Sequence, residues 1–90
     1  MAIAAIITKI MPTSPNANLE EIKKKARESM EKLNAKNISF EEREIAFGLK
    51  AIMMKMAWPE EQSTEIIETT LAGIENVSSA RIEDYRRAFG

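Results

Sequence analysis

Two stretches of the sequence carry apolar residues along a single stripe at helical spacing, and they constrain the fold more than any other feature. The first stripe runs from Leu19 to Leu33 in steps of three or four residues, and the second consists of Ile67, Leu71 and Ile74. A helix with one apolar stripe buries that stripe against another element and leaves its other side in water. The chain therefore needs a further layer that both helices can cover.

Both predicted helices have recognisable capping residues. Asn18 predicts the N-cap of the first helix, because Glu21 follows three residues later as in a capping box. Ser63 or Thr64 is expected to cap the start of the second helix. Gly73 is expected to take a left-handed conformation at the C-terminus of that helix, where glycine is favoured.

Four stretches outside the helices have the composition of β-strands. Residues 2–11 are rich in isoleucine and apolar on both faces of an extended chain, so we expect this strand to be central in its sheet. The other strands are expected at residues 37–41, at residues 48–57 and from Val77 to about Tyr85. Their predicted inward-facing pairs are Ile38 with Phe40 in the second strand, and Ala80 with Ile82 in the last.

The order strand, helix, strand, strand, helix, strand has a simple three-dimensional solution. Both apolar stripes can cover the same face of a four-stranded antiparallel sheet, with right-handed crossovers in each half. The predicted fold class is α+β, a ferredoxin-like βαββαβ sandwich with two helices on one face. A chain of 90 residues suffices for one modest core, so residues 1–90 are predicted to form a single domain.

The stretch 45–52 joins the second and third strands and contains Gly48 between bulky apolar residues. A glycine in this setting is typical of a bend or bulge at the entry to a strand, because it has no Cβ. Phe47 then has two interpretations, a core residue or a side chain presented to a partner. Trp58 is expected in the connection after the third strand, and it also has two interpretations. It either caps the core or lies at an interface.

Three groups of side chains suggest a function but have a plainer structural interpretation. The basic cluster at residues 23–27 alternates with glutamates, so we interpret it as a solvated helix face and not as a phosphate site. The acidic run at residues 41–44 lacks the aspartates and glycine of a calcium loop, which favours exposed charge at a strand end. The methionines within residues 53–56 are expected to fill the core and not to form an adaptable binding surface.

The absence of cysteine and histidine excludes several kinds of functional site. The chain has neither a thiolate nor an imidazole to bind zinc or to activate a nucleophile. Its formal net charge of −1 lacks the positive excess of a nucleic-acid binder, and no apolar run reaches the roughly 18 residues of a membrane span. We therefore expect a cytoplasmic protein with no cofactor and no bound metal, which contacts neither nucleic acid directly nor a membrane.

The sequence lacks the residues needed for two functions that other proteins of this fold perform. Small acyl-phosphate hydrolases of this fold need an arginine in the first strand–helix loop, but residues 11–18 contain no basic side chain. RNA-binding sheets need aromatic residues on the first and third strands, and neither predicted strand has one. We therefore expect no enzymatic activity. A small-molecule-sensing or structural interaction module of the same fold remains as an alternative.

Four separated motifs, spread over the whole chain, resemble those of the archaeal elongation factor 1-beta family. They are residues 10–15 after the first strand, 45–51 entering the third, 71–77 closing the second helix and 86–90 at the terminus. The resemblance implies the same βαββαβ fold that the periodicity predicts. It also implies a guanine-nucleotide exchange factor for elongation factor 1-alpha, the GTPase that carries aminoacyl-tRNA to the ribosome.

The resemblance further implies which residues contact the GTPase. In the family, the phenylalanine of an Ala-Phe-Gly motif contacts the second domain of the GTPase, and Phe47 matches it. A basic residue near the C-terminus reaches the magnesium and phosphate region and disturbs it. That residue is a lysine in the family, whereas alignment on the terminus places Arg87 there, with Arg86 just before it, so both arginines are candidates for this role and for contact with the GTPase. Lys50 and Tyr85 complete the predicted contact set, and we expect the free protein to be a monomer.

Overall fold

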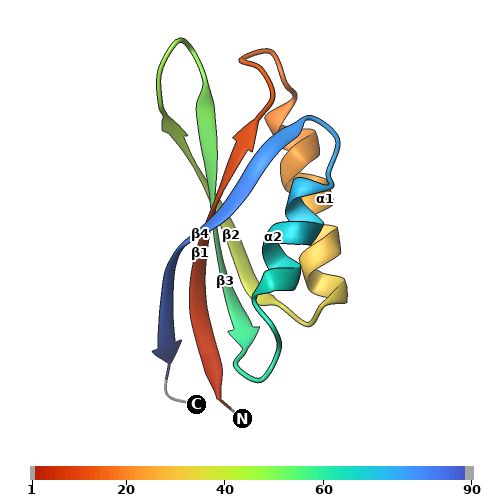
Figure 1. The fold of residues 1–90 in the computed structure, drawn as a ribbon, viewed down its shortest axis with the longest axis vertical. Coiled ribbons are helices and arrows are strands. Elements are labelled where there is room, and N and C mark those ends of the chain that lie inside the picture. The colour runs from red at the N-terminus through yellow and green to blue at the C-terminus, as the bar shows by residue number, and fades with distance from the viewer. Residues whose placement is uncertain (1, 89–90) are drawn as a thin grey trace.

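The computed structural model of the protein describes residues 2–88. Its elements follow the predicted order, and Figure 1 shows both helices against one side of a long twisted sheet. The elements are β1 (Ile3–Pro12), α1 (Leu19–Lys32), β2 (Lys36–Glu44), β3 (Lys50–Pro59), α2 (Glu65–Ala72) and β4 (Val77–Ala88).

The four strands form one antiparallel sheet in the order β2-β3-β1-β4. This confirms the predicted ferredoxin-like α+β fold, and β1 lies in the interior of the sheet as predicted. Strand β2 is longer than expected, because it continues to Glu44, and β3 begins and ends two residues later than expected, at Lys50 and Pro59. Strand β4 is also longer, and its three extra residues include both arginines near the chain's end.

The core lies between the helices and the side of the sheet that they cover, called the helix side below. The predicted stripe of α1 is buried through Ile22, Ala26 and Met30, and that of α2 through Ile67 and Leu71. Burial of these side chains removes apolar surface from water, which is the main stabilising contribution to such a fold. Strand residues of the helix side that pack there include Ala4, Ile6, Ile10, Ile38, Ile52, Met54, Met56 and Ala80.

Trp58 belongs to β3 and not to the following connection, so the predicted end of this strand was wrong. Alternation along β3 places Trp58 on the same side as Met56, and its side chain is completely buried. Its indole Nε1 donates a hydrogen bond to the carbonyl oxygen of Gln62 at 3.2 Å, so the one polar group of the buried side chain has a partner. Trp58 is therefore a core residue.

The capping predictions had different outcomes at the two helices. Asn18 accepts a hydrogen bond from the backbone N–H of Glu21 at 3.1 Å, as predicted. Ser63 accepts one from the N–H of Glu65 at 3.2 Å. The prediction for Gly73 was wrong, because its φ of −82° is right-handed. The left-handed residue is Asn76, with φ of 71°, which reverses the chain just before β4.

A bulge in β4 decides which way the end of the chain faces. Ile7 of β1 pairs with Asp84, but the next residue, Thr8, pairs with Ile82, so Glu83 is an extra residue on β4. An extra residue reverses the alternation of side chains beyond it. After the bulge, therefore, odd-numbered residues of β4 lie on the helix side and even-numbered residues on the uncovered face.

Candidate functional site

The β2–β3 hairpin closes with a tight turn at residues 46–49. The N–H of Leu49 donates to the carbonyl oxygen of Ala46 at 2.9 Å. The two central residues, Phe47 and Gly48, have φ of 54° and 78°. Positive φ at both positions is what a type I′ hairpin turn requires, and glycine tolerates it best. Gly48 thus belongs to the reversal itself and not to a bulge at the entry to β3.

Phe47 projects from the tip of this turn into solvent. Its side chain is 96% exposed, so the interpretation of Phe47 as a core residue was wrong. A bulky residue is also strained at positive φ, by about 1 kcal/mol or more. The chain therefore maintains both an exposed aromatic ring and a strained backbone at this position, a combination that is typical of a binding contact.

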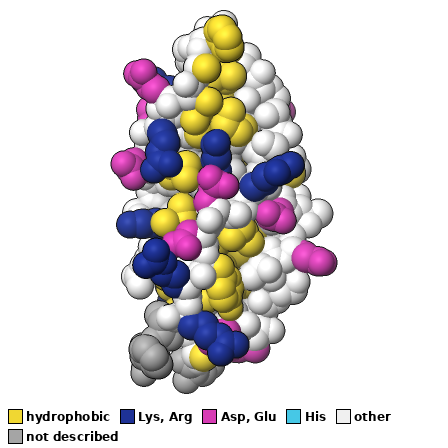
Figure 2. Space-filling model, turned by 60° about the vertical axis from the view of Figure 1, so that its left-hand side comes forward, with side chains coloured by type: hydrophobic (Ala, Val, Ile, Leu, Met, Phe, Trp, Pro, Cys, Tyr) yellow, Lys and Arg dark blue, Asp and Glu magenta, His cyan; other side chains and the backbone are white. Residues whose placement is uncertain are grey.

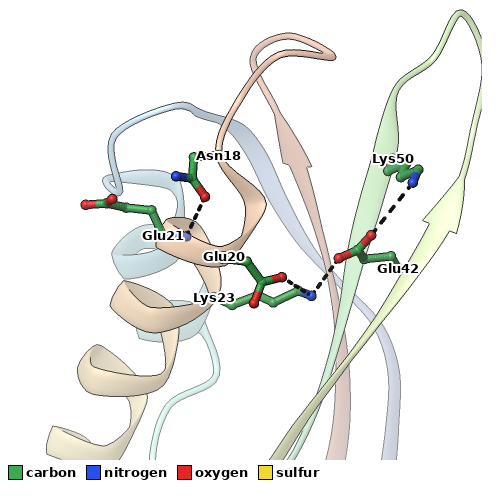
Figure 3. A network of polar contacts seen from close by, with 6 residues as sticks. All are labelled: Asn18, Glu20, Glu21, Lys23, Glu42 and Lys50. Carbon is green, nitrogen blue, oxygen red and sulfur yellow. Dashed lines mark hydrogen bonds and ion pairs between the residues drawn. The ribbon is translucent and has the colours of Figure 1, made fainter.

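Near its turn, the hairpin is connected to α1 through a chain of charged side chains. The Nζ of Lys23 donates to the Glu42 carboxylate at 2.7 Å and to that of Glu20 at 2.9 Å. Lys50 approaches the same Glu42 carboxylate from β3, with its Nζ 4.0 Å from Oε1. Figure 3 shows Glu42 between the two lysines. Lys50 is thus held near the hairpin, a few residues from Phe47.

These contacts shift the pKa values of both partners in the expected directions. The hydrogen bond from Lys23 holds the pKa of the Glu42 carboxyl below its ordinary value of 4.5. The hydrogen bonds to Glu42 and then to Glu20 raise the pKa of Lys23 above 10.5. The basic cluster is a solvent-facing helix surface, as expected, but Lys23 within it is half-buried and paired with glutamates. Arg27 is exposed, and its guanidinium lies 5.2 Å from the centre of the Phe40 ring.

At the opposite end of the sheet, Tyr85 and Arg87 lie on the helix side of β4. Tyr85 pairs with Ile6 and Arg87 with Ala4, two helix-side residues of β1. The Arg87 side chain is 78% exposed, and its Nε lies 2.9 Å from Oε1 of Glu60, the residue that follows β3. We call Tyr85, Arg87 and Glu60 the terminal cluster.

Arg86 lies on the other face of the sheet. It pairs with Ala5, and its Nε is 3.0 Å from the Asp84 carboxylate of the same strand. Arg86 and Asp84 line a shallow groove of about 690 Å³ on the uncovered face. Figure 2 shows apolar side chains along the length of the molecule, with charges of both signs around them. Because Arg86 and Arg87 lie on opposite faces of β4, only one of them can enter a given site of a partner while β4 keeps one orientation.

Of the five residues that the sequence assigned to one contact set, four lie at the two ends of the sheet and the fifth, Arg86, lies on the uncovered face. Phe47 and Lys50 are at the hairpin end, and Tyr85 and Arg87 are at the end where Figure 1 places the termini. Arg87 lies level with Trp58 of β3, through Ala4, and Trp58 is eight residues beyond Lys50. Eight strand residues span about 26 Å. A body whose longest extent is 41 Å thus carries the two groups near its opposite ends.

The ion pairs of two acidic residues at these ends were not predicted from the sequence. Glu42 is exposed, as predicted for residues 41–44, but its spacing of two from Phe40 also places it on the helix side, where it pairs with Lys23. Glu60 had no signal in the sequence, because its partner lies 27 residues away on another strand. Within residues 2–88, no group of three potential ligands could hold a metal ion, and no helix is long and apolar enough to cross a membrane.

Comparison with known proteins identifies the family. Residues 5–88 match the model of the EF-1 guanine nucleotide exchange domain. The chain belongs to this family. The exchange domain is 37% identical to elongation factor 1-beta of Staphylothermus marinus over 97% of its own length and 98% of that protein's. It is 41% identical to elongation factor 1-beta of Methanocaldococcus jannaschii, with 88% of this chain and 90% of that protein aligned.

These relatives confirm the resemblance that the four motifs indicated. A third, elongation factor 1-beta of Methanothermobacter thermautotrophicus, is 39% identical over 88% of this chain and 89% of its own. The exchange domain is thus a nucleotide exchange factor of translation elongation. The alternative of a small-molecule-sensing or structural module is not favoured, because the match extends over nearly the whole chain.

Proposed function

We propose that this exchange domain accelerates GDP release and GTP loading on elongation factor 1-alpha, without covalent chemistry of its own. It would act in the cytoplasm as a monomer whose partner is the GTPase itself. In this proposal Phe47 docks on the GTPase, and Arg87 disturbs its magnesium and phosphate site.

The observation that carries this proposal is the separation of the two exposed groups. The strand positions that carry the apolar ring and the guanidinium lie about 26 Å or more apart along one sheet. A body of this shape can contact two domains of one partner at once. The hairpin end would supply affinity through a buried aromatic anchor. The terminal cluster would supply the effect on the nucleotide.

Exchange follows from thermodynamic linkage. A partner that binds the nucleotide-free GTPase better than the nucleotide-bound form must weaken nucleotide binding by the same factor. The GTPase holds GDP through its phosphate loop and a magnesium ion. A guanidinium delivered to that region repels the cation and competes for phosphate oxygens as a planar, forked donor. GDP is released more easily once the ion's contribution is lost.

The faces of β4 on which the two arginines lie favour Arg87 over Arg86 for this role. Arg87 is on the helix side near the end of the sheet, and its side chain is 78% exposed. Arg86 points to the groove on the uncovered face and pairs with Asp84 of its own strand. Tyr85 is 41% exposed on the same side as Arg87 and would add contact area beside it.

The direct test is GDP release from the cognate elongation factor 1-alpha loaded with a fluorescent GDP analogue. Micromolar exchange domain is expected to accelerate release in the presence of excess GTP. Excess EDTA, which removes magnesium, should reduce the acceleration, because the proposed target of Arg87 is then already gone. An unchanged release rate at saturating exchange domain would contradict the proposed function.

A further inference from the structure

Glu60 is a fixed acidic group beside the exposed end of β4. It directly follows β3, and its backbone N–H donates to the carbonyl oxygen of Ala2 at 3.1 Å. Its side chain is 21% exposed, compared with 41% for Asp84, the acidic partner of Arg86. Glu60 is thus the better shielded of the two carboxylates that hold a terminal arginine.

The contact between Glu60 and Arg87 joins two strands that are not neighbours. Strand β1 lies between β3 and β4, and Ala4 of β1 is the residue opposite both Trp58 and Arg87. Because Ala4 has a small side chain, the long side chain of Arg87 can extend over it to reach Glu60. The contact is made through Nε, and it is the one ion pair of Arg87 that the described part of the chain contains. Because the printed contact is at Nε, a further partner can bind the terminal nitrogens of the guanidinium without displacing Glu60.

We propose that Glu60 is a positioning residue that orients the Arg87 guanidinium for the exchange reaction. This inference rests on the proposed function. An arginine side chain loses up to about 2 kcal/mol of rotamer free energy when it becomes fixed. A carboxylate that fixes the Nε side in the free protein reduces the part of that cost that falls on the complex. The terminal nitrogens then face the GTPase already oriented.

The place of the contact on the guanidinium indicates that Glu60 orients Arg87 and does not block it. A carboxylate that held the terminal nitrogens would have to be displaced before Arg87 could bind phosphate or replace a cation. A contact at Nε can persist in the complex while the terminal nitrogens bind the GTPase. Asp84 gives Arg86 no comparable direction, because both residues belong to one strand and face the open groove.

The test is a double-mutant cycle on GDP release. Glu60→Gln keeps the shape but loses the charge, and Glu60→Ala loses both. The matched control is Glu61→Gln, the exposed neighbour, for which the described residues provide no ion pair. We expect each Glu60 variant to lower the saturated release rate about two- to fivefold, the range of an exposed ion pair. The half-saturating concentration should stay nearly constant, because docking depends on Phe47.

The cycle separates positioning from a structural effect. In the Arg87→Ala background, Glu60→Gln should cause no further loss, since its effect passes through the arginine. Raising the salt concentration should shrink the difference between Glu60→Gln and the wild type, because the pair is partly exposed. An equal loss with and without Arg87 would overturn the inference, as would a faster rate in Glu60→Ala.

A second measurement keeps this inference separate from the proposed function. In the free protein, the NMR signal of the Arg87 Nε–H should shift in Glu60→Gln and stay in place in Glu61→Gln. If the signal is unaffected by Glu60→Gln, the orienting contact is absent and the inference fails while the exchange function stands. If the signal shifts but Arg87→Ala exchanges normally, the role of Arg87 in exchange fails, and the positioning role fails with it.

Discussion

The two ends of the sheet present their exposed groups by different means. At the hairpin end, a four-residue turn with two left-handed residues suffices to expose Phe47. At the other end, the direction of Arg87 depends on a bulge in β4, on pairing with β1 and on a carboxylate beyond β3. The first end is local in sequence, and the second is built from three distant segments. A docking element can be carried by a short loop, whereas a group that acts inside a partner's site needs a scaffold.

This comparison predicts its largest effect for Arg87. Arg87→Ala should lower the saturated GDP-release rate about 5- to 150-fold, the range of typical coupling between two sites. Arg86→Ala is the matched control, because it removes the same charge from the opposite face of β4. Stopped-flow release measurements with both variants compare the two faces directly. A larger loss in Arg86→Ala would place the acting group on the groove side.

The hairpin end should control binding and leave the saturated rate unchanged. Phe47→Ala is expected to raise the half-saturating concentration of the exchange domain about thirtyfold, which corresponds to a hot spot of about 2 kcal/mol. Ile66→Ala, on the exposed side of α2, removes an apolar side chain elsewhere and is the control. Titrations of GDP release would measure both. Unfolding of the Phe47 variant would show that the ring is structural despite its exposure.

The turn that exposes Phe47 should tolerate an added Cβ poorly. Gly48→Ala is expected to destabilise the fold by about 1 kcal/mol, because φ is 78°. The new Cβ would meet Pro15 at an ordinary 3.8 Å, so the cost lies in the backbone. Gly73→Ala is the control, and its effect on stability should have the opposite sign. Its φ of −82° suits alanine, and it should stabilise by about 0.4–1 kcal/mol. Urea unfolding of both variants tests this contrast.

The smallest effect concerns the ion pair that ties the hairpin to α1. The lowered pKa of Glu42 means that its contribution to stability is present above about pH 4.5 and is lost as the pH falls through the lowered value. The raised pKa of Lys23 means that its contribution is present below about pH 10.5 and is lost as the pH rises through the raised value. Glu42→Gln should therefore lower the melting temperature slightly between these limits.

The pH profile can be checked against a neighbouring glutamate. Glu41 is exposed on the other face of β2, so Glu41→Gln should leave the melting temperature nearly unchanged at every pH. The curves of Glu42→Gln and the wild type should converge at acid pH, where the Glu42 carboxylate is protonated. A constant difference at all pH values would show that shape and not charge connects the hairpin to the helix.

The sequence alone determined the order of the elements and the faces of most of them. Helical stripes and strand alternation depend on neighbours a few residues apart, so periodicity reveals them. The same is true of the Asn18 cap. The four motifs identified the family, and with it Phe47 as a candidate contact. The conformation of Gly73 and the place of Trp58 were predicted wrongly, because one depended on the path into β4 and the other on where β3 begins and ends.

Only the tertiary structure decided how the ends of the sheet are built. Simple alternation from Ala80 and Ile82 would place Arg86 on the helix side and Arg87 on the open face, but the bulge at Glu83 reverses both. Nothing local marks this bulge, since it is set by pairing with β1, which lies more than 70 residues earlier. The contact of Glu60 with Arg87 has the same origin. The pairing register and the face on which each side chain lies depend on contacts between distant segments, so they are fixed only when the sheet assembles.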